Sequence, residues 1–287
     1  MPGEACTIVK RSSDRPYRAV IFNADDFGLS PGVNRGIVQA HRRGVVRAAS
    51  LMVTAPASAE AVSFAREHPE LDLGVHLALT AVSPVEQPQD IPTLVTRHGR
   101  FPRFGHWLLR VLSRRIDPAD IRREFVAQVE RALATGLHFS HLDSHHHVHL
   151  FPIVRGVVAE VAREFGLPFV RRMAPRRRGY GLVTAAKHRI LESLERSPRT
   201  VSRNPETVGA ALIPSPQSPG RWRSFLRSLP EGVTELICHP GFCDPVLAQL
   251  DSYAVGRERE LRWLMSQELA SLLIEANLDV TSLSALA

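Results

Sequence analysis

The sequence predicts an α/β fold in a single domain: a TIM-like (β/α) barrel, complete or else distorted and incomplete. The chain has 287 residues, a length that suits one such barrel. Short apolar segments alternate with amphipathic segments, a pattern typical of βαβ units around a parallel sheet. Several apolar segments end in aspartate or histidine, as expected where barrel strands carry polar groups to one face. We expect residues 1–17 to form a flexible tail and residues 18–287 to form the barrel.

Strands are expected where short apolar runs lie between turn-forming residues. They cover residues 19–26, 50–54, 72–79, 137–144, 168–170, 234–238 and 279–282. Helices are expected where apolar residues recur at helical spacing, as in Ile121, Phe125 and Val129. Ser30 and Pro31 are a typical N-cap and first helical residue. The helices cover residues 31–43, 57–67, 118–135, 152–165, 181–196 and 256–276.

The segment His141–His149 holds five of the thirteen histidines and one aspartate. Because side chains alternate along a strand, His141, Asp143 and His145 would share one face. Imidazole and carboxylate groups together suit a borderline divalent metal ion. A purification tag is disfavoured, since a tag is terminal and lacks an interior aspartate. A structural polar cluster is the alternative interpretation.

Two further segments supply candidate ligands. The first apolar run ends in Asp25 and Asp26, where one carboxylate can bind a metal and the other can accept a proton. The alternative is that one aspartate caps the next helix, a role that Ser30 fills better. His76 lies within an apolar strand, where a lone histidine is more often a core residue than a ligand.

These segments, in this order, resemble the YdjC-like family of carbohydrate deacetylases. The matching motifs are Asn23–Ser30, Gly74–Leu77, His141–His149, Cys238–Gly241 and Tyr253–Leu261. The last of these, which includes Arg257, matches more loosely than the others. The resemblance spans residues 18–286, nearly the whole chain. A subgroup tied to hopanoid biosynthesis has a similar layout, and the sequence does not separate it from the chitooligosaccharide deacetylases.

The resemblance implies a barrel-shaped, metal-dependent hydrolase that removes an N-acetyl group from an amino sugar, either an oligosaccharide or a lipid-linked glycoside. It implies that Asp26, His76 and His145 hold one divalent metal ion. Two histidines and one carboxylate would leave positions open for water and substrate. Zinc and magnesium are favoured, and manganese and iron stay open.

The residue types beside these ligands predict further roles. Asp25 would act as the general base, and His239 would be the general acid, since imidazole titrates near neutral pH. His141 and His147 are the alternative acids. Asp143 could orient a ligand imidazole from outside the ligand shell. We therefore expect four residues to support the ligands or to contact the substrate: His141, Asp143, His147 and Arg257.

Two long connections interrupt the alternation of strands and helices. Residues 81–117 and residues 197–219 are rich in proline or serine, and connections of this length are usually lids or binding loops. Aromatic residues in or beside them could form a platform under a sugar ring or could simply pack against the barrel: Phe101, Phe104, Trp107 and Trp222.

The net charge of +7 and the isoelectric point near 10.1 invite a nucleic-acid-binding interpretation. Lys10 and Lys187 are the only lysines, so the charge is nearly all arginine. This indicates a compositional bias rather than a selected binding surface. The one dense cluster, residues 171–178, could contact an anionic group or a lipid headgroup, but a solvated loop is favoured.

The expected partner is a small amino-sugar substrate, with no nucleic acid. Peripheral membrane contact is expected if the substrate is lipid-linked, and a homodimer stays open. No segment approaches the length of a membrane span or a secretory signal, and three cysteines do not make a disulfide framework, so the cytoplasm is expected. Two other functions stay open: another hydrolase on the same barrel, such as a phosphodiesterase, and a non-catalytic metal- or nucleic-acid-binding protein.

Overall fold

The computed structural model describes residues 17–286 apart from 173–204, 209–212, 217 and 252. The tail predicted over residues 1–17 therefore lies almost wholly outside the described residues. The helix predicted over residues 181–196, most of the arginine cluster and much of the second long connection also lie outside them.

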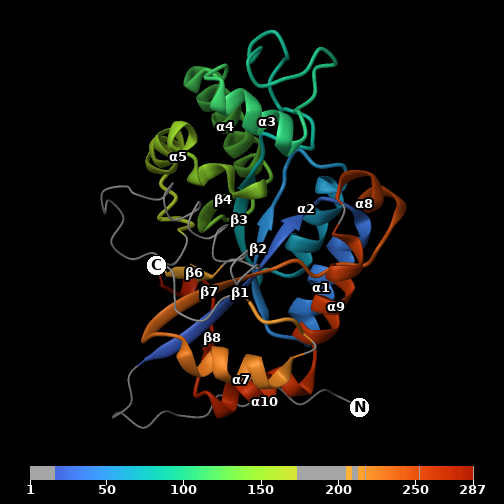
Figure 1. Cartoon of the computed structure of the whole chain (residues 1–287), viewed down its shortest axis with the longest axis vertical. Helices are drawn as coiled ribbons and strands as arrows, with labels where there is room; N and C mark the ends of the chain where they lie inside the picture. Colours follow the sequence, from blue (N-terminus) through green and yellow to red (C-terminus); the bar gives the residue numbers. More distant parts are fainter. Residues whose placement is uncertain (1–16, 173–204, 209–212, 217, 252, 287) are drawn as a thin grey trace.

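An all-parallel sheet forms the centre of the described structure, and helices cover its outer face (Figure 1). The strands are β1 (Arg18–Phe27), β2 (Val46–Leu51), β3 (Asp72–Leu77), β4 (His141–Ser144), β5 (Phe169–Val170), β6 (Glu206–Val208), β7 (Gly232–Cys238) and β8 (Asp279–Val280). Their order is β5-β4-β3-β2-β1-β7-β6, and β8 pairs with the start of β1. The helices are α1 (Pro31–Arg43), α2 (Ser58–Glu67), α3 (Phe104–Leu112), α4 (Pro118–Leu133), α5 (Pro152–Glu164), α7 (Pro219–Ser228), α8 (Pro245–Leu250), α9 (Ala254–Leu264) and α10 (Gln267–Glu275).

The sheet curls until its two edge strands approach each other. The Thr207 N–H of β6 donates to the carbonyl of Arg172, just beyond β5, at 3.1 Å. Ile21, Ala48 and Phe169, from three different strands, pack together inside the curl. This is an incomplete barrel of the TIM type, and the predicted fold class is confirmed.

Several predicted elements agree closely with the structure. Helix α1 has the predicted bounds, and the Ser30 hydroxyl accepts from the Val33 N–H as its N-cap. Helices α2, α4 and α5 and strands β1 and β7 lie within two residues of their predicted positions. The amphipathic spacing and the cap residues were therefore enough to locate these elements.

Five other predictions were wrong in position or extent. The strand expected at residues 137–144 is β4, at His141–Ser144, and the connection expected over residues 197–219 contains strand β6. The strand expected at residues 50–54 is β2, at Val46–Leu51; its centre is rich in alanine, so no apolar run marked its start. The helix expected over residues 256–276 is two helices, because Ser266 ends the first and caps the second. The connection over residues 81–117 contains helix α3.

The aromatic residues proposed for a sugar platform mostly pack in the core. Phe101, Trp107 and Trp222 are buried. Phe104 is only partly buried, and its ring centroid lies 5.2 Å from that of His146. Phe101 and Trp107 thus pack against the barrel, whereas Trp222 also lines a cavity.

Candidate metal centre

The ends of β1, β3 and β4 bring together Asp26, His76 and His145. One ligand atom from each lies within 4.8 Å of the other two, and all three residues are buried. The His145 Nδ1 is 2.8 Å from the Asp26 Oδ1, and the His76 Nε2 is 3.3 Å from the same oxygen. Three residues far apart in the sequence therefore point two imidazole nitrogens at one carboxylate oxygen.

The backbone at this face is strained where it presents the ligands. Asp26 has a φ of 70°, and His146 and His147, directly after His145, have φ of 55° and 52°. Non-glycine residues rarely adopt this left-handed region, and such outliers gather at functional sites. The turn at Asp26 separates its side chain from that of Asp25, although the two residues are adjacent.

Asp143 fixes the orientation of His76. The strand register places these two residues opposite each other on β4 and β3, and the His76 Nδ1 is 2.7 Å from the Asp143 Oδ1. The carboxylate accepts, so Nδ1 carries hydrogen, and Nε2 is the nitrogen that faces Asp26. The Ser50 hydroxyl also donates to Asp143, at 2.6 Å. A carboxylate behind an imidazole in this way is the usual support of a metal-binding histidine.

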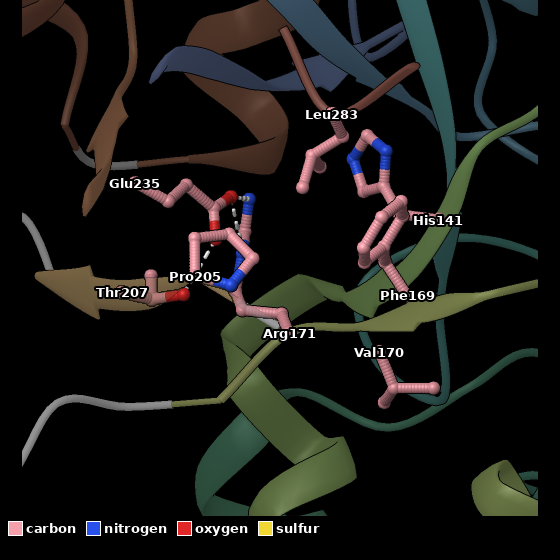
Figure 2. Close-up of a pocket in the computed structure, with 8 residues that line it drawn as sticks. All are labelled: His141, Phe169, Val170, Arg171, Pro205, Thr207, Glu235 and Leu283. Atoms are coloured by element: carbon pink, nitrogen blue, oxygen red, sulfur yellow. Dashed lines mark hydrogen bonds and ion pairs between the residues drawn. The ribbon is translucent and has the colours of Figure 1, made fainter. Parts of the chain in front are cut away.

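Arg171 is buried in the candidate metal centre. The prediction that the arginine cluster forms a solvated loop was therefore wrong for this residue. Its guanidinium group forms two hydrogen bonds of 2.7 Å with Asp25 and further ion pairs with Asp143 and Glu235. Figure 2 shows its side chain directed at Glu235, with Thr207 beside them. The sequence signal was available: Arg171 directly follows the apolar end of β5, just as Asp25 follows an apolar run.

Arg257 of helix α9 holds the other carboxylate. It is buried, and its NH2 group lies 2.6 Å from the Asp26 Oδ2 and 2.5 Å from the Asp251 Oδ2. The resemblance led us to expect Arg257 near the ligands, and the structure places it against Asp26. The two adjacent aspartates are thus paired with different arginines.

The centre carries more negative than positive charge. It contains four buried carboxylates and two buried guanidinium groups: Asp25, Asp26, Asp143, Glu235, Arg171 and Arg257. Burial opposes ionisation of Asp25 and Asp26, yet the arginines keep the pKa of both carboxyls below the ordinary value. Burial would also lower the pKa of His76, but Asp143, Asp26 and Asp25 raise it to about 10. A centre that attracts a proton this strongly, with a formal excess of two negative charges, suits a divalent cation.

The remaining predicted histidines differ in whether their ring nitrogens have hydrogen-bond partners. The His141 nitrogens lie 2.8 Å from the Ser140 hydroxyl and 3.3 Å from the Ser50 hydroxyl. Gly74 makes room for this ring, since a Cβ there would lie 2.1 Å from its Nε2. The His147 Nδ1 is buried without a partner among the described residues, and burial lowers the pKa of His147 to about 4.

His239 lies just beyond β7 and is held through its backbone. Its N–H donates to the Glu260 carboxylate at 2.6 Å, and the Tyr253 hydroxyl donates to the same carboxylate at 2.7 Å. The His239 and Tyr253 rings are 6.2 Å apart, and the buried Nδ1 of His239 has no partner in the described part of the chain. Its ring forms no hydrogen bond with the three clustered residues.

The chain has relatives among known proteins. Residues 19–275 match the model of the family described as YdjC-like protein. The chain belongs to the YdjC-like family. Relatives named carbohydrate deacetylase include one from Vibrio cholerae that is 37% identical, one from Vibrio vulnificus that is 40% identical and one from Geobacillus stearothermophilus that is 38% identical. Each alignment covers 92–93% of this chain and 96% of the relative.

A solved structure extends the similarity to the fold. The crystal structure of a protein from Enterococcus faecalis, described as a candidate cellobiose-phosphate cleavage protein, superposes with a TM-score of 0.77 at 29% identity. The match covers 94% of this chain and 99% of that one. The likeness thus extends over the whole barrel and its surrounding helices.

Proposed function

We propose that this chain is a metal-dependent hydrolase that removes the N-acetyl group of an N-acetylated amino sugar and releases acetate. One observation carries the proposal. Two imidazoles converge on the Asp26 carboxylate beside a second, separately paired carboxylate, in a chain closely related to proteins named carbohydrate deacetylase.

We assign Asp26, His76 and His145 as the ligands of one divalent ion, with zinc or magnesium favoured and manganese or iron possible on ligand type. When bound, such an ion would acidify a water molecule and polarise the acetyl carbonyl. Asp143 and Arg257 would hold the two sides of this ligand set, through His76 and Asp26 respectively. The orientation of the ligands would then survive loss of the ion.

Asp25 is the proposed general base. Because Arg171 keeps its pKa low, Asp25 is ionised at neutral pH and is ready to accept a proton from the attacking water. The two hydrogen bonds from Arg171 and one from the Asn23 amide at 2.9 Å fix its orientation. A base held this firmly needs no reorganisation before the proton moves.

His239 is the proposed general acid for the departing amine. Its unpartnered Nδ1 supports this role. His147, whose Nδ1 is also unpartnered among the described residues, is the alternative, but a pKa of about 4 leaves it neutral at pH 7 and makes it the poorer proton donor. His141 suits the role less well, since both its nitrogens face serine hydroxyls. His239→Ala should slow cleavage of an amide far more than cleavage of an activated ester, whose leaving group needs little protonation. Equal losses on both substrates would contradict the assignment.

The activity itself is tested by a screen of metal-loaded protein against N-acetylated sugars. Mass spectrometry would detect replacement of an acetyl group by hydrogen, and an acetate assay would confirm the second product. The screen should include an activated phosphodiester. Asp25, His76 and Asp143 also lie close enough together to hold an ion, but Arg171 is paired with both of these carboxylates, so we expect no second metal ion and no phosphodiesterase activity.

A cavity lined mainly by apolar residues reaches Cys238, directly before His239, and supports a substrate with an apolar aglycone. The cavity has a volume of about 410 Å³, and its walls include Cys238, Tyr253, Trp222 and Trp263. Both indole N–H groups are buried without a partner among the described residues. We propose that a lipid-linked glycoside places its aglycone there. Each added methylene in a series of alkyl glycosides should then lower KM by up to about fourfold; a flat series would favour oligosaccharides.

The partner and location predictions are supported less directly. Helix α3 exposes Leu109 and Leu112, and Arg103, Arg114 and Arg115 are exposed around them. Leucines between arginines suit peripheral contact with an anionic membrane, which flotation with vesicles would test. In the described part of the chain, no helix has the length and hydropathy to cross a membrane. A cytoplasmic location and a homodimer stay predictions.

A further inference from the structure

A second group of candidate metal ligands lies away from the centre described above. His41 is in the last turn of α1, and His68 and Glu70 lie in the short connection between α2 and β3. One ligand atom from each lies within 4.8 Å of the other two. These residues adjoin the starts of β2 and β3, at the end of the barrel opposite to Asp26. The sequence pattern did not single them out.

The hydrogen bonding of His41 fixes which of its nitrogens carries hydrogen. Its Nδ1 lies 3.0 Å from the carbonyl oxygen of Val46. A carbonyl oxygen only accepts, so Nδ1 must be the donor. In the neutral ring, Nε2 then carries no hydrogen and presents a lone pair. This nitrogen lies 3.0 Å from the Glu70 Oε1. Two acceptors at this distance repel each other unless a cation, a proton or a metal ion, lies between them.

The position of His68 favours a metal ion over a proton between His41 and Glu70. The His68 Nδ1 is 3.6 Å from the same Glu70 oxygen, and its ring lies edge-on to that of His41 with centroids 5.9 Å apart. A proton on His41 would satisfy one nitrogen and one oxygen, whereas a metal ion would satisfy both imidazoles and the carboxylate. The backbone carbonyl behind His41 is the kind of partner that supports a metal-binding histidine.

We propose that His41, His68 and Glu70 bind a zinc ion that links the end of α1 to the connection between α2 and β3. Two histidines and one carboxylate form a common zinc ligand set, and solvent would supply the fourth ligand because Glu70 is exposed. Arg47 also donates to the Val46 carbonyl, at 2.8 Å, and its charge weakens the site. We therefore expect a lower affinity than that of a zinc site with the same ligands and no neighbouring cation. The ion would be structural and would take no part in the reaction at the other end of the barrel.

The experiment separates this site from the catalytic one. In a His76→Ala chain, calorimetric titration with zinc should still show one site. A hundredfold excess of zinc over Kd should raise the thermal midpoint by about 5 °C. Adding His68→Ala and Glu70→Gln to that chain should abolish both effects. Glu67→Gln, which changes an exposed carboxylate three residues away, is the matched control and should leave both effects intact.

Two outcomes would overturn the zinc site. The first is absence of zinc binding to the His76→Ala chain, with a stability that zinc does not change; the pair would then be an ion pair between protonated His41 and Glu70. The second is unchanged zinc binding after His68 and Glu70 are replaced. Should His76→Ala fail to fold, Asp26→Asn provides the same background. None of these readouts depends on deacetylase activity.

Discussion

The two sides of the barrel rim supply different kinds of group to the candidate metal centre. One side, made by β1, β3 and β4, supplies Asp26, His76 and His145 from compact motifs. The other side, made by β5, β7 and α9, supplies single charged residues: Arg171, Glu235 and Arg257. The first side contains the groups able to bind a metal, and the second sets their charge and orientation.

The adjacent aspartates show what this difference means. Asp25 is paired with Arg171, whereas Asp26 is paired with Arg257 and faces two imidazoles. Nothing in the sequence Asp25-Asp26 distinguishes the two carboxylates. Their environments differ because the backbone turns between them and because different arginines meet them. The imidazoles of the first side therefore single out Asp26 as the ligand, and the arginines of the other side hold each aspartate in place.

The largest effect is expected on the side with the ligands. His76→Ala removes one of three proposed ligands, so bound metal and deacetylase activity should both be lost. The loss of metal affinity should exceed the roughly 10–100-fold typical of residues that only support a ligand. Metal analysis, activity and circular dichroism would be measured together, because the fold should survive. Full metal occupancy in both His76→Ala and Asp26→Asn would refute the ligand set.

Asp25→Asn should separate the two aspartates. The amide cannot accept the proton, so kcat should fall by about 10²–10⁴-fold while the metal content stays unchanged. Asp26→Asn provides the comparison, since it should lose the metal as well. A rate near that of the unchanged protein would exclude Asp25 as the base. Loss of metal in Asp25→Asn would show that the two carboxylates act as one ligand group.

Arg171→Met tests the other side of the rim. Three carboxylates would lose their shared buried counter-charge, and the free energy of unfolding should fall by about 3–5 kcal/mol. Arg223→Met is the matched control, since it removes an arginine paired with Glu275 at the surface. That change should have a much smaller effect on the free energy of unfolding, because an exposed pair is screened by solvent. Equal losses in urea unfolding of the two variants would mean that Arg171 contributes no more than a surface pair.

How far the sequence predicted the structure depends on the same distinction. The barrel class and the convergence of Asp26, His76 and His145 followed from apolar segments that end in polar residues, together with a family resemblance. Arg171 was misjudged because a run of arginines is usually solvated, and only the approach of β5 to β6 buries its first member. Local patterns locate elements, whereas the partner of a charge depends on how the sheet closes.

The smallest expected effect is on the pH dependence of stability. It concerns His149, which belongs to the segment His141–His149 but not to the proposed ligand set. His149 is buried, and its Nδ1 lies 2.6 Å from the Ser144 hydroxyl. Burial and the nearby positive groups lower its pKa from 6.5 to about 3. The unfolded chain therefore binds a proton at a higher pH than the folded chain does. The stabilisation is fully present above pH 6.5 and is lost as the pH falls from there towards 3.

His149→Gln should remove this part of the acid sensitivity. Below pH 6.5, the slope of the unfolding free energy against pH should decrease by up to about 1.4 kcal/mol per pH unit, the contribution of one proton. Urea unfolding at several pH values would measure the slope, and His106→Gln, which changes an exposed histidine, is the control. If the two variants lost stability in parallel as the pH fell, His149 would not be the neutral, buried imidazole that its contacts indicate. The acid sensitivity of the rim would then have to come from His146 and His147, whose pKa values burial also lowers, to about 3 and about 4.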